Sequence, residues 1–524
     1  MYRKSNAAGT VRSKGKAPFG QSSTAGSSFQ EKLEYFKSVF HHTQDFVIRD
    51  FDAFGGTSAA ALFFTSLVDK DMISETVIKP LMQLSAKPEP ADSSRAAELV
   101  LKQTMFHADG KTAPDCRLAV SDLLAGSAVV LIEGFDEAIV VNVQKVEQRA
   151  VEQPKSEQVI RGPRDGFIEN LQTNIALIRT RLPTEQLKMK TLQLGRLTKT
   201  SVILLYLDGI ANPKLVEDVE RRLNAIDIDR ILDAGYIEQY VQDNPWSPFP
   251  QIRNTERPDV TVGNLLEGRV AILTDGSPYA LLCPTSFAMF YQTSEDYNER
   301  AGIMSMLRLV RLMALLFSLI TPSLYIAILS FHPELIPTKF AVAVASGRAG
   351  VPFPTFLEVF VMEVAVEILR EATVRMPQQI GGALSIVGVL VIGQAAVMAG
   401  FVSPITVVVI ALTTISSFAT PAYNAAMAFR MLRFPIIAAT GLFGFFGLIL
   451  ALFLVNNHLI SLRSFGVPFL APVAPLNAAG LKDAIIRAPI RFLLDRPAEL
   501  RPRERLRAAP YPNPRSGSNG RGTS

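Results

Sequence analysis

The architecture of this chain follows from Leu312-Met-Ala-Leu-Leu-Phe-Ser-Leu-Ile-Thr-Pro-Ser-Leu-Tyr-Ile-Ala-Ile-Leu-Ser-Phe331, the first of four long apolar runs. The other three are Gly381–Phe401, Val402–Thr420 and Pro435–Asn456. A helix needs about 20 apolar residues to cross the roughly 30 Å hydrocarbon core of a bilayer, and each run has about that length. The sequence therefore predicts an α-helical, polytopic membrane domain over residues 301–465.

A charged helix is expected between the first two runs, within Val351–Arg375. Glu363, Glu367 and Glu371 recur every four residues and so share one helix face, with Arg370 beside them. An acidic side chain at the centre of a bilayer costs about 2.5–3.5 kcal/mol on insertion scales, so this stripe should not face lipid. Two interpretations stay open: a buried polar stripe that lines a cavity, or an interfacial helix with solvated charges.

The run Gly381–Phe401 is the predicted pore-lining helix. Its amide, Gln394, should not face lipid, because its hydrogen-bonding groups would have no partner there. Val387, Val391 and Met398 share its face at helical spacing, and a ring of such side chains closes a channel by dewetting. The alternative is that Gln394 bonds to a neighbouring helix.

The first 300 residues are expected to lie in the cytosol, because the basic, Ser/Gly-rich amino-terminal segment does not resemble a signal peptide. The two cysteines are far apart, which argues against a disulfide framework or a zinc site. The predicted organisation is a disordered tail at 1–29, two small cytosolic α/β units at 30–155 and 156–300, the membrane domain at 301–465 and a basic Pro/Arg-rich tail at 466–524.

Each soluble unit is predicted to mix helices with a strand–turn–strand. In the first unit these are helices at Glu31–Phe40, Asp71–Leu84, Ser93–Phe106 and Asp115–Leu124, and two strands within Ala128–Asn142. In the second they are the hairpin Leu187–Leu194 and Thr200–Leu207, helices Lys214–Ala225 and Arg230–Gln242, and strands within Arg269–Cys283 around Asp275-Gly276. The strand–turn–strand within Arg269–Cys283 resembles the one within Ala128–Asn142. We interpret this likeness as coincidence rather than as an internal duplication.

A proline-rich loop, Asn244–Pro258, holds the only tryptophan of the chain. Its four prolines exclude a helix or a central strand. One interpretation is an ordered loop with its aromatic residues against the domain, and the other is a docking surface for a partner. The candidate docking residues are Trp246, Pro248, Phe249, Pro250, Arg253, Asn254 and Arg257.

Basic residues give conflicting signals about orientation. Arg308 and Arg311 indicate that the first run begins in the cytosol, and Arg487–Arg507 indicate the same side for the tail, which requires an even number of crossings. Arg430 and Arg433 also favour the cytosol, which does not fit that count unless one segment is re-entrant. In the tail, Gly480–Leu494 is expected to form a short amphipathic helix, and the remainder to be disordered.

The sequence contains no recognisable enzyme motif. Asp109-Gly-Lys-Thr112 resembles the end of a phosphate-binding loop, but Met105 stands where that motif needs glycine. The five histidines have no zinc-protease spacing, and no serine lies in a nucleophile elbow. We therefore predict no catalytic activity, metal or cofactor.

Ten segments give the chain a family resemblance. They are Arg161–Pro163, Asn174–Arg181, Ser247–Asp259, Gly268–Leu273, Ser330–His332, Val351–Pro354, Met362–Val364, Glu367–Glu371, Val391–Ala396 and Phe429–Phe434. Through them, over roughly residues 160–475, the chain resembles the A subunits of GerA-type spore germinant receptors. The resemblance implies a homo-oligomer in the spore inner membrane that conducts ions when germinant binds. It also implies a transporter-like B subunit and a lipoprotein C subunit as partners.

Other function classes remain as alternatives to this ion channel subunit. A secondary transporter is disfavoured because the membrane region shows no evident repeat. A non-conducting membrane scaffold stays open, as does a SpoVAF-like spore membrane protein that amplifies ion release. A nucleic-acid partner is not expected, because the arginines do not alternate with stacking aromatics.

Overall fold

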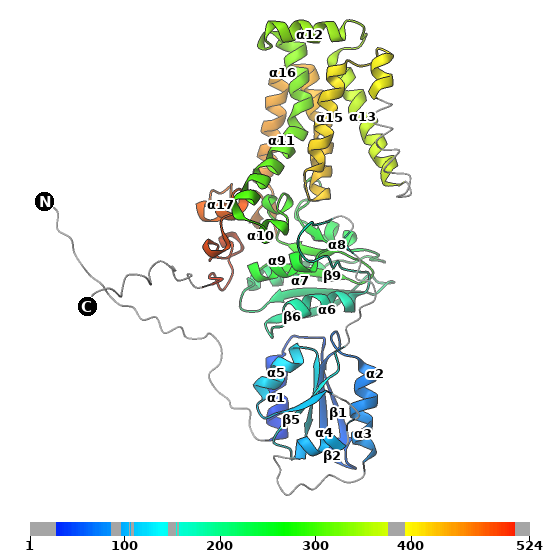
Figure 1. The fold of residues 1–524 in the computed structure, drawn as a ribbon, viewed down its shortest axis with the longest axis vertical. Helices are drawn as coiled ribbons and strands as arrows, with labels where there is room; N and C mark the ends of the chain where they lie inside the picture. The colour runs from blue at the N-terminus through cyan, green and yellow to red at the C-terminus, as the bar shows by residue number, and fades with distance from the viewer. Residues whose placement is uncertain are drawn as a thin grey trace, which may run out of the picture. The chain divides into compact units, whose positions relative to one another are not determined.

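The computed structural model describes residues 28–84, 96–103, 105, 109–144, 153–154, 157–375 and 393–508 of the chain. The chain divides into two compact units (Figure 1). One comprises the residues up to His41 together with Phe46–Lys145, and the other comprises His42–Asp45 and the chain from Val146 onward. The second unit holds both an α/β part and the long apolar helices.

The first unit is a five-stranded antiparallel sheet of order β1-β2-β4-β5-β3 with helices around it. Its helix α1 begins with a capping box, in which Ser28 and Glu31 exchange backbone and side-chain hydrogen bonds. The strands are β1 (Phe46–Ala53), β2 (Thr57–Phe64), β3 (Gly110–Ala113), β4 (Ser127–Ile132) and β5 (Ala138–Asn142). The helices are α1 (Phe29–Val39), α2 (Lys70–Ile73), α3 (Lys79–Gln83), α4 (Ala96–Gln103) and α5 (Cys116–Leu124), with a π-helical segment, Ser74–Ile78, between α2 and α3.

The sequence predicted only part of this sheet. The strands within Ala128–Asn142 are confirmed as β4 and β5, and the four predicted helices have counterparts among α1–α5. The strands β1, β2 and β3 were not predicted. Strand β2 reads Thr-Ser-Ala-Ala-Ala-Leu-Phe-Phe, and alanine lacks the bulk that makes a strand pattern visible.

The second sheet is also five-stranded and antiparallel, with order β6-β7-β9-β10-β8. Along β7, Val202 and Leu204 pack into the core beneath α7 and α8, whereas Ile203 and Leu205 pack into the core beneath α6 and α9. The sheet is therefore covered on both faces, which explains its nearly continuous apolar strands. The elements are α6 (Leu171–Arg181), β6 (Leu187–Leu194), β7 (Thr200–Leu207), α7 (Pro213–Asn224), α8 (Ala234–Val241), β8 (Arg253–Thr255), α9 (Pro258–Glu267), β9 (Val270–Thr274) and β10 (Ala280–Cys283).

The two sheets have the same topology. In each, a helix and a hairpin are followed by helices, an edge strand, another helix and a second hairpin. The two later hairpins, β4–β5 and β9–β10, therefore occupy equivalent places in equivalent sheets. This shared five-strand order favours an internal duplication over the coincidence that the hairpins alone indicated.

The apolar runs form a bundle of helices that follows the second sheet (Figure 1). Of the described helices, α11 and α16 are long and apolar enough to cross a membrane, and α15 is apolar but shorter. The predicted run Gly381–Phe401 lies largely outside the described residues, which include a helical segment at 393–398. The elements are α10 (Glu295–Asn298), α11 (Ala301–Phe331), α12 (Thr338–Arg348), α13 (Thr355–Val374), α15 (Pro404–Phe418) and α16 (Tyr423–Ser461).

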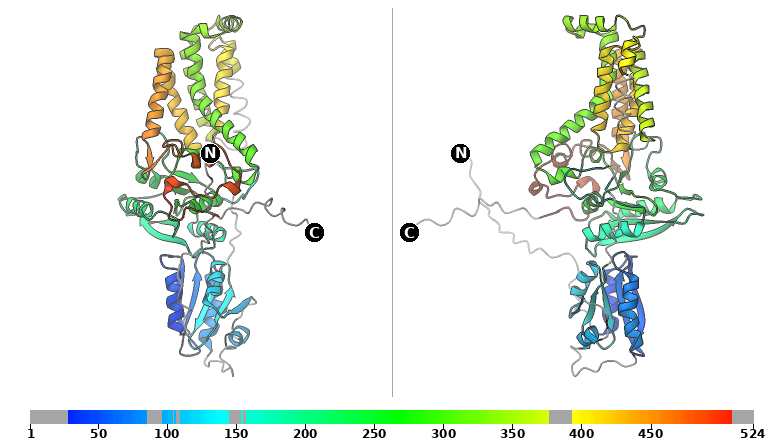
Figure 2. Two further views of the ribbon diagram at one scale, coloured as in Figure 1. Left: turned by 90° about the vertical axis from the view of Figure 1, so that its left-hand side faces the viewer. Right: turned by 45° about the vertical axis from the view of Figure 1, so that its right-hand side comes forward.

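Helix α16 doubles back on itself at Gly444, where φ is +59° and ψ is −138°, a conformation that glycine tolerates best. The rings of Phe429 and His458 lie 5.4 and 6.1 Å from the ring of Phe249. A straight helix would separate residues 29 positions apart by about 43 Å, so the two halves of α16 must run antiparallel. Figure 2 shows them side by side in orange.

The prediction of one crossing by Pro435–Asn456 was therefore wrong, because Gly444 turns the chain inside that run. Both ends of α16 contact the segment that follows β10: the Ala422 N–H donates to the Phe290 carbonyl at 3.4 Å, and the Thr285 N–H donates to Ser464 Oγ at 2.9 Å. Because Gly444 turns the chain, the half of α16 that carries Arg430 and Arg433 begins beside Phe290, and an even number of helix passages no longer requires a re-entrant segment.

The carboxyl-terminal segment is more ordered than its composition indicates. Helix α17 (Ala478–Ala484) covers only the start of the predicted helix Gly480–Leu494. The chain then stays against the sheet, where the Arg503 N–H donates to the Ile210 carbonyl at 3.0 Å and Arg496 Nε donates to the Leu266 carbonyl at 2.8 Å. The prediction of disorder was wrong as far as residue 508, because these backbone partners hold the segment.

Candidate functional site

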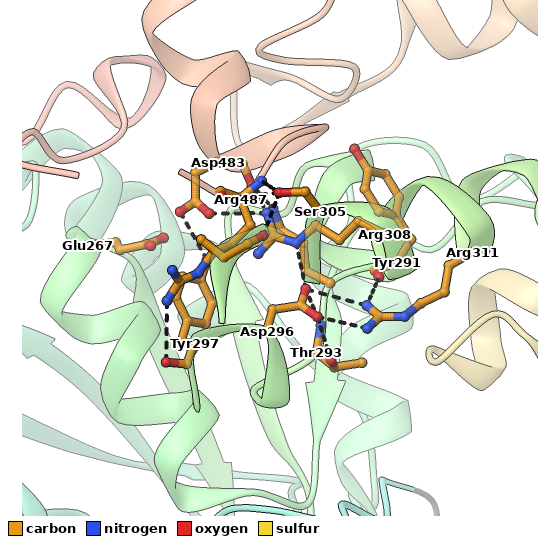
Figure 3. A network of polar contacts seen from close by, with 12 residues as sticks. Glu267, Tyr291, Thr293, Asp296, Tyr297, Ser305, Arg308, Arg311, Asp483 and Arg487 are labelled. Carbon is orange, nitrogen blue, oxygen red and sulfur yellow. Dashed lines mark hydrogen bonds and ion pairs between the residues drawn. The ribbon is translucent and has the colours of Figure 1, made fainter. Parts of the chain in front are cut away.

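A network of charged side chains surrounds the base of α11 and joins it to α10 and to the carboxyl-terminal segment (Figure 3). At its centre is Asp296 of α10, whose side chain has no exposed surface. Arg308 Nε lies 2.6 Å from Asp296 Oδ2, and Arg311 Nη2 lies 2.8 Å from Asp296 Oδ1. Thr293 donates its hydroxyl to the same carboxylate at 3.0 Å. One buried acid therefore holds two arginines that are almost one helical turn apart on α11.

The same arginine reaches the carboxyl-terminal segment. Arg308 Nη1 lies 3.1 Å from Asp483 Oδ1 on α17, and the Tyr297 hydroxyl donates to Asp483 Oδ2 at 2.9 Å. Arg487 Nη2 donates to the Tyr297 carbonyl at 3.3 Å, and the Arg487 N–H donates to Ser305 Oγ at 3.1 Å. This junction network, defined as Asp296, Tyr297, Ser305, Arg308, Arg311, Asp483 and Arg487, ties α10, α11 and the carboxyl-terminal segment together.

The two acids of the junction network have opposite pKa shifts. Burial alone would raise the pKa of Asp296, but the hydrogen bonds and charges of Arg311 and Arg308 outweigh it and hold the pKa below its usual value. Burial dominates at Asp483 and raises its pKa despite the neighbouring Arg308. The network is thus built around an ionised Asp296, which neutralises arginine charge at the foot of an apolar helix.

The proline-rich loop packs against the end of α16. The ring of Phe249 is 2% exposed and lies near the rings of Phe429 and Phe469, with centroid distances of 5.4 and 6.4 Å. Ser247 Oγ lies 2.8 Å from His458 Nε2 in the last turn of α16. Trp246, by contrast, is 93% exposed. The packed interpretation is thus right for Phe249 and wrong for Trp246.

The arginines of this loop are internal rather than available for docking. Arg253 is buried and donates from Nη1 to the Met289 carbonyl at 2.8 Å. Arg257 is 2% exposed, pairs with Asp259 at 2.8 Å and donates to the Pro163 carbonyl at 3.0 Å. The docking prediction was therefore wrong for Phe249, Arg253 and Arg257, because their side chains hold the loop to its own chain. Pro248 is exposed, and Pro250 and Asn254 are half-buried.

The acidic stripe of α13 divides between two environments. Glu363 and Arg433 are each 3% exposed and lie 2.5 Å apart, which joins α13 to α16. Glu367 is partly exposed and lies 3.5 Å from Arg370 and 3.8 Å from Arg430. Glu371 is exposed and pairs with Arg375 at 2.6 Å. The stripe is thus buried in an ion pair at Glu363 and exposed at Glu371, so its two ends lie in different environments.

A second buried acid, Glu358, was missed in the sequence. Its Oε1 lies 2.8 Å from Arg348 Nη2, and its Oε2 accepts from the Ser403 N–H and the Thr406 hydroxyl, both at 3.0 Å. It therefore binds the first turn of α15, where exposed backbone N–H groups favour a negative charge. The available signal was Ser403-Pro404, which is typical of a helix start.

The candidate gate residues are only partly described. Val387 and Val391 lie outside the described residues, whereas Gln394 and Met398 lie in the helical segment 393–398 and are exposed. Among the described residues, no group of three or more His, Cys, Asp or Glu side chains could hold a metal ion. Cys116 and Cys283 are both buried and unpaired.

Comparison with known proteins assigns the chain to a family. The family model described as Bacillus/Clostridium GerA spore germination protein matches residues 34–499. The chain belongs to the GerA family. Its membership extends to residues 34–155, where the sequence motifs gave no literal match.

GerA relatives align over most of the chain. Spore germination protein KA of Bacillus subtilis (strain 168) is 44% identical over 430 residues, which cover 82% of this chain and 78% of that protein. The uncharacterized membrane protein YfkQ of the same strain is 38% identical over 471 residues, 90% of this chain and 91% of that one. The family model and the likeness to spore germination protein KA support a role for this GerA chain in spore germination.

A solved structure also matches. It is the crystal structure of the N-terminal domain of the A subunit of the Bacillus megaterium spore germinant receptor GerK3. That domain is 33% identical and aligns over 51% of this chain and 99% of its own, with a TM-score of 0.41.

Proposed function

We propose that this chain is the A subunit of a nutrient germinant receptor in the spore inner membrane, and that its helical domain forms an oligomeric, germinant-gated ion channel. The proposal that the bundle lies in a membrane rests on one observation: large apolar side chains are exposed on the bundle, and charged side chains are buried inside it. On α16, Leu442, Phe446 and Phe453 are 72%, 70% and 65% exposed. In the same bundle, Glu363 and Arg433 are buried against each other. Lipid favours this arrangement and water does not.

The channel part rests on the membrane bundle and on the family. The junction network connects the base of α11 to α10, in the segment that follows the second sheet, and a receptor needs such a connection if a signal on the soluble part is to move α11. The partners proposed for the chain are a transporter-like B subunit, a lipoprotein C subunit and further copies of itself. The amino-terminal units are proposed to lie in the cytosol. Val387, Val391, Gln394 and Met398 remain the proposed gate.

Ion release from liposomes tests the channel. The chain should be reconstituted in potassium-loaded liposomes, and potassium efflux measured without germinant. We expect Val391→Ala and Val387→Ala liposomes to leak, because a smaller side chain widens a hydrophobic constriction. Val408→Ala is the matched control, since Val408 is a 66% exposed residue of α15 and should face lipid.

Tight liposomes for both gate variants, at normal protein content, would remove this helix as the gate. The second candidate function, a non-conducting scaffold of the germination complex, would then be favoured. The observation that favours a scaffold is that Glu363 and Arg433 neutralise each other inside the bundle. Their charges are therefore balanced without an ion that passes through the protein. Deletion of the chain distinguishes a SpoVAF-like role from the channel and the scaffold. Germination should then be slower but still occur if the chain only amplifies ion release, and should fail if the chain is part of the receptor.

A further inference from the structure

Trp246 is the only tryptophan of the chain, and its side chain is 93% exposed. This exposure does not come from a loose loop. The Trp246 N–H donates to Asn244 Oδ1 at 3.0 Å, and Asn244 exchanges two backbone hydrogen bonds with the Gln251 amide, at 2.8 and 2.6 Å. Phe249, three residues further on, is buried. A fixed loop thus presents one large aromatic ring outward.

The loop lies at the level of the last turn of α16, because Ser247 Oγ contacts His458 Nε2 at 2.8 Å. Near this end of α16 polar side chains join the apolar ones on the exposed surface. Phe453 and Leu454 are 65% and 58% exposed, Asn456 and Asn457 follow and are exposed, and Ile460 in the last turn is 59% exposed. Such a change marks the boundary between hydrocarbon and headgroups on a membrane helix.

A tryptophan beside that boundary has a preferred environment. Its ring is mainly apolar, but its indole N–H needs a hydrogen-bond partner, and the headgroup region satisfies both requirements. Arg463, two residues beyond α16, is also exposed, and anionic headgroups attract such a cation. The loop of Trp246 thus lies beside the end of α16, and Arg463 lines the same hollow as Asn244, the first residue of the loop.

We propose that the loop Asn244–Phe249 is a membrane-interface anchor and that the Trp246 indole lies among the lipid headgroups. The loop then holds the second sheet at a fixed height against the leaflet, because the same six residues bind both α16 and the lipid surface. This inference rests on the proposed membrane function. It adds a contact between the soluble sheet and the lipid surface, separate from the spanning helices.

Tryptophan fluorescence tests the anchor on the unmodified chain, since all tryptophan emission comes from this one residue. The full chain should be reconstituted in vesicles of phosphatidylcholine and phosphatidylglycerol whose acyl chains carry bromine, a quencher, near the headgroup or near the methyl end. We expect strong quenching by the shallow bromine, weaker quenching by the deep bromine and little quenching by iodide in the water. Trp246→Phe should abolish the tryptophan emission.

A matched control moves the single tryptophan to the opposite side of the second sheet. The double variant Trp246→Phe/Gln172→Trp places it at an exposed position of α6, which covers the face opposite α7 and α8. This variant should be quenched by iodide and not by either brominated lipid.

Three results would overturn the anchor. Quenching of Trp246 by iodide alone would place the ring in water, and quenching by neither agent would place it under a second copy or another protein. Quenching mainly by the deep bromine would place it in the hydrocarbon core. Flotation of the chain with vesicles at alkaline pH separates this question from the membrane function. A chain that floats but shows no lipid quenching refutes only the anchor, whereas a chain that does not float refutes the membrane function as well.

Discussion

Asp296 and Arg308 form an ion pair with no exposed side-chain surface. A buried pair of this kind is expensive to break, because removing one charge leaves the other uncompensated. We expect Asp296→Asn to lower the free energy of unfolding by about 3–5 kcal/mol. Thermal unfolding of the full chain in detergent, together with its amount in membranes, measures this loss.

The matched control for Asp296 is Glu299→Gln. Glu299 pairs with Arg161 at 2.9 Å, but these side chains are 34% and 68% exposed, so the pair should contribute less than about 1 kcal/mol. Equal unfolding temperatures for Asp296→Asn and Glu299→Gln would show that the junction network does not hold the base of α11 to α10.

Glu238 on α8 gives a pH-dependent prediction. Burial, and then the nearby Asp233, raise the pKa of Glu238 to about 7. An acid with a raised folded-state pKa favours folding while it is protonated, so its contribution is complete below its unfolded pKa of about 4.3 and is lost as the pH rises to about 7. Glu238→Gln should therefore stabilise the chain by about 1–3 kcal/mol at about pH 8 and little at about pH 4.

Unfolding temperatures measured across this pH range check the Glu238 prediction. Glu217→Gln on α7 is the control, because Glu217 is exposed and its substitution should change stability by less than about 0.5 kcal/mol at either pH. A Glu238→Gln curve parallel to that of the parent chain would contradict the raised pKa.

The residues of the junction network could be predicted only in part. Arg308 and Arg311 stood out as charges at the start of an apolar run, and a buried arginine needs an acid nearby. Asp483, however, is 175 residues from Arg308, so nothing local identifies it as the partner. Phe249 and Trp246 had the same sequence context, and only their packing distinguishes them.

At the scale of elements, the turn at Gly444 determines how many helices the bundle has. Gly444→Ala should destabilise the bundle by on the order of 2 kcal/mol, because a positive φ disfavours any side chain and an added Cβ would lie 2.7 Å from the ring of Phe331. Protein yield and unfolding temperature measure the effect.

Gly347 of α12 is the control for Gly444. An added Cβ at Gly347 meets nothing within 4 Å, and alanine favours a helix over glycine by up to about 1 kcal/mol. Gly347→Ala should therefore be neutral or stabilising. A Gly444→Ala chain as stable as Gly347→Ala would mean that α16 does not need its turn.

The elements that the sequence predicted well are those with their own local signals. The hairpin β6–β7 and the turn at Asp275-Gly276 have alternating apolar residues or a turn dipeptide, and both are confirmed. The reversal of α16 has no such signal, because the apolar run continues through Gly444 on both sides. The carboxyl-terminal segment resembled a disordered tail because its partners, such as the Leu266 carbonyl, are backbone groups far away in the chain.

At the scale of the second unit, both ends of the bundle's path return to the soluble sheet. The base of α11 is held by Asp296 of α10, in the segment that follows the sheet, and the segment after α16 is held through Ser464 by the Thr285 N–H, two residues after β10. Helix α11 has 31 residues and is therefore about 46 Å long, enough to cross a bilayer with some excess. Helix α12 follows its far end, so α12 and the second sheet should lie on opposite sides of the membrane.

Single cysteines test this arrangement. Lys339 on α12 and Lys214 on α7 are both exposed, whereas the native Cys116 and Cys283 are buried. On intact cells, an impermeant thiol reagent should label Lys339→Cys directly, and should label Lys214→Cys only after the membrane is opened. The parent chain measures the background. Labelling of Lys214→Cys from outside would place the sheet on the external face, and protection of both positions on intact cells would mean that α11 does not cross. The predicted pattern requires that α11 crosses the membrane. An even number of crossings for the whole bundle follows separately from the return of both its ends toward the sheet, and the reversal at Gly444 makes that count possible while the half of α16 with Arg430 and Arg433 begins on the side of the sheet.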